Sequence, residues 1–264
     1  MQNSKSTAGN LSDRVVSYLI DYTRRNRLPC GAEIPSEGTL SSELKVSRGV
    51  VREAYRSLKT AGIIDIGNGR SPRVGRLSNL AFSQFLNHAL STEQASAAQV
   101  FDVRSSIEVR AAELAARNRT DDDALQLQHE AEVMRASIRQ RRRFVNADMR
   151  FHEVLGRATG NPLFALLSSA LRESLDATIR AGFDARHTQA QLNRVAQIHA
   201  DIAGAITAGN PARARRAMTT HFDEARLFVT AIQHKPAARR RRPTGARRLA
   251  RATPRAPRAS AKSQ

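Results

Sequence analysis

Four side chains in the C-terminal half have the types and spacing that suit a divalent metal ion. Asp148 and His152 are four residues apart and would share one face of a helix. His199 and His221 each lie on the apolar stripe of another helical segment. Inward polar groups need partners, and one shared cation would satisfy all four. The set suits zinc first, with nickel or manganese as alternatives. Spacing alone also allows each histidine to be a hydrogen-bonded core residue.

A second group of side chains, in the N-terminal third, suits DNA. Ser47 can cap a helix that extends to about Ala61, on which Arg48 and Arg52 share an exposed face. Arginines near the start of such a helix can pair with guanine O6 and N7 in the major groove. Ser47 and Gly49 would let the free N–H groups of the helix start approach a phosphate.

The elements that position the DNA-binding group follow in the order of a winged helix-turn-helix. Apolar spacing predicts a helix over 11–26, then a short helix over 36–44 that Ser36 can cap, then the helix after Ser47. Gly67-Asn68-Gly69 between short apolar runs predicts a hairpin. We therefore expect a winged helix-turn-helix domain over 11–75.

The remaining chain predicts an all-helical antiparallel bundle, so the fold class is mainly α. We expect a disordered segment over 1–10, a linker over 76–99, the helical domain over 100–234 and a disordered basic tail over 235–264. The starts of helices within the bundle are marked by capping residues followed by acids or proline. These starts are Thr120 before Asp121, Asn161-Pro162 and Asn210-Pro211.

Composition and net charge limit the class of protein and the kinds of partner that this chain can have. The chain of 264 residues carries a net charge of +19, and residues 235–264 hold 11 Lys and Arg and no acid, which leaves +8 for the rest. This excess favours a polyanion such as nucleic acid. The single Cys30 fits a reducing compartment. No segment reads as a signal peptide or a membrane span, so we expect a cytoplasmic protein without a membrane partner.

The segment from Ile34 to Ala54, with Pro35-Ser36-Glu37 and Val46-Ser47-Arg48 at set spacing, resembles the DNA-binding domain of the GntR family of bacterial regulators. The resemblance implies that four residues contact double-stranded operator DNA and that a glycine occupies the wing tip. These are Ser47, Arg48, Gly49, Arg52 and the wing residue Gly69. We add Ser36 and Arg70 to this set. Gly38 departs from the pattern, because many members carry a basic residue there.

The helical half resembles FCD, the ligand-binding domain of a FadR-like GntR subfamily. The resemblance rests on Val103-Arg104-Ser105-Ser106-Ile107-Glu108, on Asp148-Met149-Arg150-Phe151-His152 and on the His199 and His221 segments. It implies a metal held by Asp148, His152, His199 and His221, and an effector carboxylate bound by Arg104. Arg104 could instead pair on the surface with Glu108 at i+4.

Together these patterns predict a homodimeric, metabolite-responsive regulator rather than an enzyme. We expect a repressor of a catabolic operon that reads a pseudo-palindromic operator and responds to a small sugar or carboxylic acid beside the metal. The alternative is an architectural protein whose basic tail coats DNA without sequence preference. A metal-dependent hydrolase is the weakest interpretation, because neither an HExxH helix nor a nucleophile with its base is present.

Overall fold

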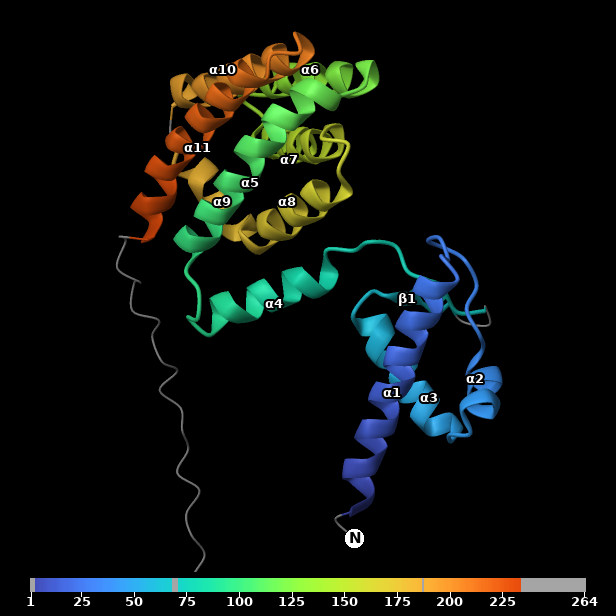
Figure 1. Cartoon of the computed structure of the whole chain (residues 1–264). Helices are drawn as coiled ribbons and strands as arrows, with labels where there is room; N and C mark the ends of the chain where they lie inside the picture. The colour runs from blue at the N-terminus through green and yellow to red at the C-terminus, as the bar shows by residue number, and fades with distance from the viewer. Residues whose placement is uncertain (1–2, 68–70, 187, 234–264) are drawn as a thin grey trace, which may run out of the picture.

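The computed structural model describes residues 3–67, 71–186 and 188–233, and within them the chain forms a small N-terminal unit and a larger helical unit (Figure 1). The first unit comprises α1 (Asn3–Arg25), α2 (Glu37–Leu44), α3 (Arg48–Thr60), β1 (Ile64–Asp65) and β2 (Arg73–Val74). The second comprises α4 (Leu80–Ser91), α5 (Ala97–Asn118), α6 (Asp121–Ala136), α7 (Arg141–Ala158), α8 (Pro162–Ser174), α9 (Asp176–Asp184), α10 (Gln189–Thr207) and α11 (Pro211–Gln233).

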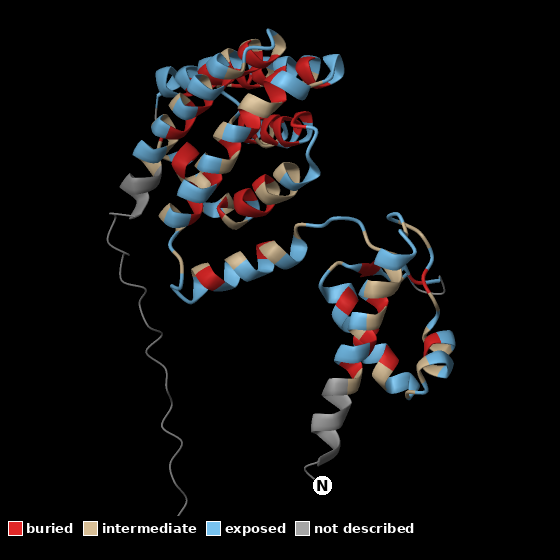
Figure 2. Ribbon diagram, in the orientation of Figure 1, coloured by how far each residue is buried: buried red, intermediate tan, exposed pale blue. Residues whose placement is uncertain are grey.

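The N-terminal unit is the predicted winged helix-turn-helix, with three helices around their own core. Apolar side chains from α1, α2 and α3 meet there, and Ile34 and Ile64 close it. Among them Leu40, Val51 and Ala54 are completely buried. The faces of these helices that point away from this core are exposed, as the burial colouring in Figure 2 shows.

Both predicted serine caps are present. Ser36 Oγ accepts a hydrogen bond from the Thr39 N–H at 3.1 Å, and Ser47 Oγ accepts one from the Val50 N–H at 3.4 Å. Each cap satisfies an N–H that the first helical turn leaves without a partner. The short helix and the recognition helix therefore start where the sequence predicts.

The hairpin is antiparallel, with Ile64 opposite Val74 and Asp65 opposite Arg73. Gly75 follows the second strand where the backbone passes close to Gly62, because a Cβ at Gly75 would stand 2.5 Å from the Gly62 carbonyl oxygen. The predicted wing-tip residues Gly69 and Arg70 lie outside the described residues.

The structure corrects the predictions at two places along the chain. Residues 1–10 were expected to be disordered, yet α1 starts at Asn3 and continues without a break into the predicted helix after Leu11. The segment 76–99 was expected to be a linker, yet it contains α4, whose Leu86 and Leu90 pack against the core of the helical unit.

The larger unit is the predicted all-helical bundle, and its helices enclose one continuous core (Figure 2). The predicted helix starts are confirmed. Thr120 and Asp123 form a capping box at α6, Asn161 Oδ1 accepts from the Leu163 N–H at α8, and Asn210 Oδ1 accepts from the Arg213 N–H at α11. The short connections at Asn161 and Asn210 bring α8 against α7 and α11 against α10. The predicted tail over 235–264 lies outside the described residues.

Candidate metal centre and DNA-binding surface

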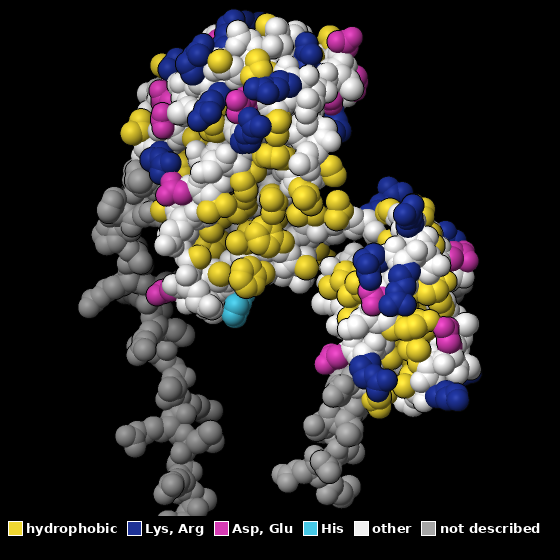
Figure 3. All heavy atoms as spheres, in the orientation of Figure 1, with side chains coloured by type: hydrophobic (Ala, Val, Ile, Leu, Met, Phe, Trp, Pro, Cys, Tyr) yellow, Lys and Arg dark blue, Asp and Glu magenta, His cyan; other side chains and the backbone are white. Residues whose placement is uncertain are grey.

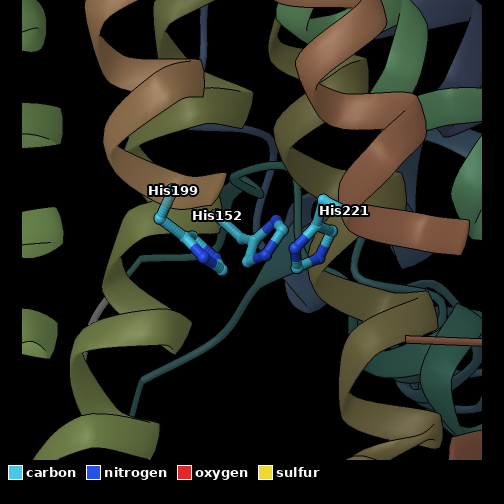
Figure 4. Close-up of side chains that lie close together, drawn as sticks. All are labelled: His152, His199 and His221. Carbon is cyan, nitrogen blue, oxygen red and sulfur yellow. The ribbon is translucent and has the colours of Figure 1, made fainter. Parts of the chain in front are cut away.

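The fold brings the four predicted ligands together from three helices. Asp148 and His152 lie on α7, His199 on α10 and His221 on α11, and the three imidazoles point toward one another (Figure 4). Each histidine offers a ring nitrogen, and these nitrogens lie within 4.8 Å of one another. Asp148 Oδ1 lies 3.1 Å from His199 Nε2 and 3.9 Å from His152 Nε2. The three imidazoles are compact enough to contact one small cation, and Asp148 lies beside two of them.

The ligand atoms that face this centre have no other hydrogen-bond partners among the described residues, as expected for residues that hold a metal ion. His152 Nε2, His199 Nε2 and Asp148 Oδ1 are buried and make no hydrogen bond of acceptable geometry within the described chain. The opposite ring nitrogens are occupied. His199 Nδ1 lies 2.8 Å from the Val195 carbonyl oxygen, and His152 Nδ1 contacts Glu108 Oε2. A carbonyl can only accept, so Nδ1 of His199 carries the proton and Nε2 keeps its lone pair.

Burial favours the neutral, metal-binding form of His152 and His221. Desolvation lowers the pKa of His152 to about 4, against the opposing attraction of Glu108, and desolvation with neighbouring imidazoles holds the pKa of His221 well below its usual value. Burial alone would raise the pKa of Asp148, but the Arg172 guanidinium and the imidazoles hold it well below its usual range. Near neutral pH Asp148 is therefore a carboxylate and the rings of His152 and His221 are neutral, the ligand forms that zinc takes.

Arg104 lies beside the centre and is buried, not on the surface. Its Nε donates to Glu108 Oε1 at 2.7 Å, so the i+4 pair is real, but both side chains are almost fully enclosed. Its Nη2 has no hydrogen-bond partner among the described residues. Arg104, Asp148 and His221 line a small cavity of about 50 Å³ under α9. One donor of the guanidinium is thus left for a ligand.

Sequence reasoning missed two further arginines that reach this region. Arg172 of α8 donates from Nη2 to Asp148 Oδ2, and Arg186 stacks on Phe228 with its carbon 3.8 Å from the ring centroid. Burial lowers the pKa of Arg186 to about 10, so it stays charged at neutral pH. Glu108 was considered only as a surface partner. The local sequence around Arg172 carries no motif, because its role depends on the approach of α8 to α7.

The predicted DNA-contacting residues lie on the exposed face of the N-terminal unit. Ser36, Ser47, Arg48, Gly49 and Arg52 are all exposed. Arg52 pairs with Glu37 at 3.1 Å, and both side chains remain accessible. A Cβ at Gly38 would stand 3.9 Å from Arg48 Nη2, so the departure from the family pattern lies directly beside the first recognition arginine.

Fold and site together define a protein that joins a winged helix-turn-helix to a helical domain with a candidate metal centre. Residues 11–74 match the bacterial regulatory proteins of the gntR family, and residues 99–224 match the FCD domain. The chain is 31% identical over 239 residues to the HTH-type transcriptional repressor NanR of Cronobacter sakazakii, which covers 87% of this chain and 89% of that protein. The chain belongs to the GntR family and carries an FCD domain, so it is a transcription regulator and not an enzyme.

Further comparisons agree on the family and the fold. The repressor NanR of Salmonella schwarzengrund is 32% identical over 222 residues, which covers 81% of this chain and 82% of that protein. The solved structure of a GntR protein of Streptococcus agalactiae superposes with a TM-score of 0.60 at 23% identity and covers 82% of this chain and 99% of that one. Among the helices of the described residues, none is long and apolar enough to cross a membrane.

Proposed function

We propose that the protein is a homodimeric, cytoplasmic repressor that binds a pseudo-palindromic operator and responds to a small organic acid beside a divalent metal, with zinc preferred. One observation carries this proposal: unpartnered ligand atoms of Asp148, His152 and His199 converge with His221 in a buried centre beside Arg104. We retain the division into a DNA-binding domain over 11–75 and an effector domain over 100–234. The bound metal would orient the acid through its open coordination positions.

The charges around the centre favour an anionic effector. Around the centre three arginines, Arg104, Arg172 and Arg186, are balanced by three carboxylates, Glu108, Asp148 and Glu224, so a bound divalent cation would leave an excess of two positive charges. An unpaired buried charge is costly. A small carboxylate would offset that charge, and a guanidinium fork can bind it through two oxygens. Arg104 has the free donor for this contact.

DNA recognition is assigned to Arg48 and Arg52, with Ser36, Ser47 and Gly49 at the helix starts and Gly69 and Arg70 on the wing. A second copy would supply the other half-site reader. An exposed apolar surface spreads over the region of α4 and α8 (Figure 3) and includes Leu80 and Phe85, which are 55% and 64% exposed. Large apolar patches of this kind mark interfaces, which supports homodimer formation.

The metal assignment is tested by elemental analysis and zinc titration of the intact protein. We expect one zinc ion per chain, and we expect His199→Ala and His221→Ala to weaken binding at least 10-fold. His129→Ala is the matched control, since His129 is an exposed histidine of α6. Unchanged zinc binding in both site variants would refute the centre.

The regulator assignment is tested against DNA upstream of the gene. Arg52→Ala should lower affinity for the specific fragment by at least 10-fold, whereas Arg139→Ala, which removes an exposed charge from the other domain, should change it little. Deleting residues 235–264 distinguishes the repressor from the alternative, a protein that coats DNA without sequence preference. Loss of all DNA binding on deletion would favour coating, and retained selectivity for the palindrome would favour the repressor.

A further inference from the structure

The last turns of α8 contact both the candidate metal centre and the helix that leads to the DNA-binding domain. Arg172 donates from Nη2 to Asp148 Oδ2. Its neighbour Glu173 points elsewhere, since successive residues of a helix are about 100° apart. Glu173 Oε2 accepts hydrogen bonds from Asn79 Nδ2 at 3.0 Å and from Ser83 Oγ at 2.9 Å. Two adjacent residues thus join the centre to α4.

The bonds to α4 are placed where they can fix the helix. Asn79 stands directly before the first residue of α4 and also donates to Ser169 Oγ at 2.9 Å. Ser83 is 2% exposed and lies on the face that α4 turns toward α8. Asn79 and Ser83 both lie at the start of α4, next to the segment that connects it to the DNA-binding domain. A shift of α8 at Glu173 therefore acts on the entry of the linker helix.

Both apolar packing and polar contacts hold α8 in place. Near its start, Ala165 contacts α7 so closely that a Cβ at Gly156 would stand 2.8 Å from the Ala165 Cα. Farther along, a chamber of about 340 Å³ opens beside Ser168, Arg172 and Glu173. Ser168 Oγ and Arg172 Nε are buried without hydrogen-bond partners among the described residues. Packing fixes α8 at Ala165 and at the buried Leu171, and the polar bonds of Arg172 and Glu173 set the position of its last turn.

We propose that Arg172 and Glu173 are positioning residues through which occupancy of the metal centre controls the order of α4. This inference rests on the proposed metal centre and names its route to the DNA-binding domain. Asp148 held as a ligand fixes Arg172, Arg172 fixes the last turn of α8, and Glu173 then holds Asn79 and Ser83. Arg172 also keeps Asp148 Oδ1 turned toward the imidazoles, because it occupies Oδ2. The link is a coupling between two sites, so it acts in both directions.

The test uses zinc alone as the probe and the full chain as the protein. Hydrogen exchange of peptides covering residues 80–91 is compared with and without saturating zinc, and zinc affinity is measured separately by competition with a chromophoric chelator. In the wild type we expect zinc to slow exchange of α4 at least 5-fold, the lower end of ordinary allosteric coupling. In Glu173→Gln we expect zinc affinity within 3-fold of wild type and the zinc-dependent slowing to be lost.

Two more variants separate positioning from mere structural support. Asn79→Ala combined with Ser83→Ala removes the same bonds from the α4 side and should behave like Glu173→Gln. Arg172→Gln should lower zinc affinity at least 10-fold as well as uncouple α4. Glu153→Gln is the matched control, because Glu153 is an exposed acid of the same chamber. It should retain the wild-type response.

The possible outcomes distinguish failure of the link from failure of the metal centre. Slowing of α4 that survives in Glu173→Gln, or no slowing in a wild type shown to hold zinc, overturns the link and leaves the metal centre intact. Failure of the wild type to bind zinc overturns the proposed centre and the link together. The decisive quantity is the difference between zinc-loaded and zinc-free exchange, which general weakening of α4 would not abolish.

Discussion

Acid should destabilise the metal-free effector domain through its buried histidines. Burial lowers the pKa of His152 from its usual 6.5 to about 4 and also lowers that of His221. Below pH 6.5 these histidines are protonated in the unfolded chain but not in the folded chain. Their contribution to the free energy of unfolding is therefore fully present above pH 6.5 and is lost as pH falls toward 4. Each histidine contributes a slope of about 1.4 kcal/mol per pH unit, and His152 alone about 3 kcal/mol over the whole interval.

The assay is urea unfolding between pH 7 and 5 after chelation of metals, followed by far-UV circular dichroism. All three tyrosines, at positions 18, 22 and 55, lie in the DNA-binding domain, so tyrosine fluorescence reports that domain separately. The pH window stays above the range where Glu108 titrates, because its pKa is held below its usual value by Arg104 and His152 despite burial. His221→Phe should remove about half of the histidine slope, whereas His88→Gln, at an exposed site, should leave it unchanged. Equal slopes in wild type and His221→Phe, or greater stability at pH 5 than at pH 7, would refute the reasoning.

Other predictions concern packing, capping and metal loading. Gly156→Ala should lower the free energy of unfolding by about 1–3 kcal/mol, since its Cβ would force α7 away from Ala165. Gly204→Ala, whose Cβ would meet nothing within 4 Å, should stabilise α10 by up to about 1 kcal/mol. Urea unfolding measures both changes, and changes of the same sign would contradict the packing argument. Ser47→Ala should lower the stability of the DNA-binding domain by about 1 kcal/mol in tyrosine-detected unfolding, and no change would mean that the cap contributes nothing. Zinc at 100-fold above its Kd should stabilise the effector domain by about 2.7 kcal/mol, an effect that a chelator reverses and Asp148→Asn weakens; equal stabilisation of Asp148→Asn would place the metal elsewhere.

Local signals in the sequence predicted most of the fold. Helix starts depend on one side chain and the next few backbone groups, so Ser47, Thr120 and Asn161 could be recognised without knowing the tertiary structure. The linker helix α4 was missed for the opposite reason. Its Leu86 and Leu90 gain stability only by packing on the other helices, which no local pattern reveals.

The metal centre could be predicted only in part. The pair at i, i+4 on α7 and the inward positions of His199 and His221 were visible from spacing. The resemblance strengthened the hypothesis that they share one metal, because long sequence separations say little about proximity. The supporting residues were invisible. Arg172 and Glu173 sit in an ordinary amphipathic stretch, and their different roles follow from which helix faces each side chain. Contacts of that kind depend on distances between helices rather than on periodicity.

The exposed face of α4 has a consequence for how steeply the regulator responds. One side of this helix packs on α8, while Phe85 and Leu80 on its other side are open. If a second subunit covers that open side, each α4 contacts both subunits. A ligand that orders α4 in one subunit then changes the binding free energy of the other subunit. The response would then be cooperative, with a Hill coefficient above one, and it would sharpen as the cellular copy number of the protein rises.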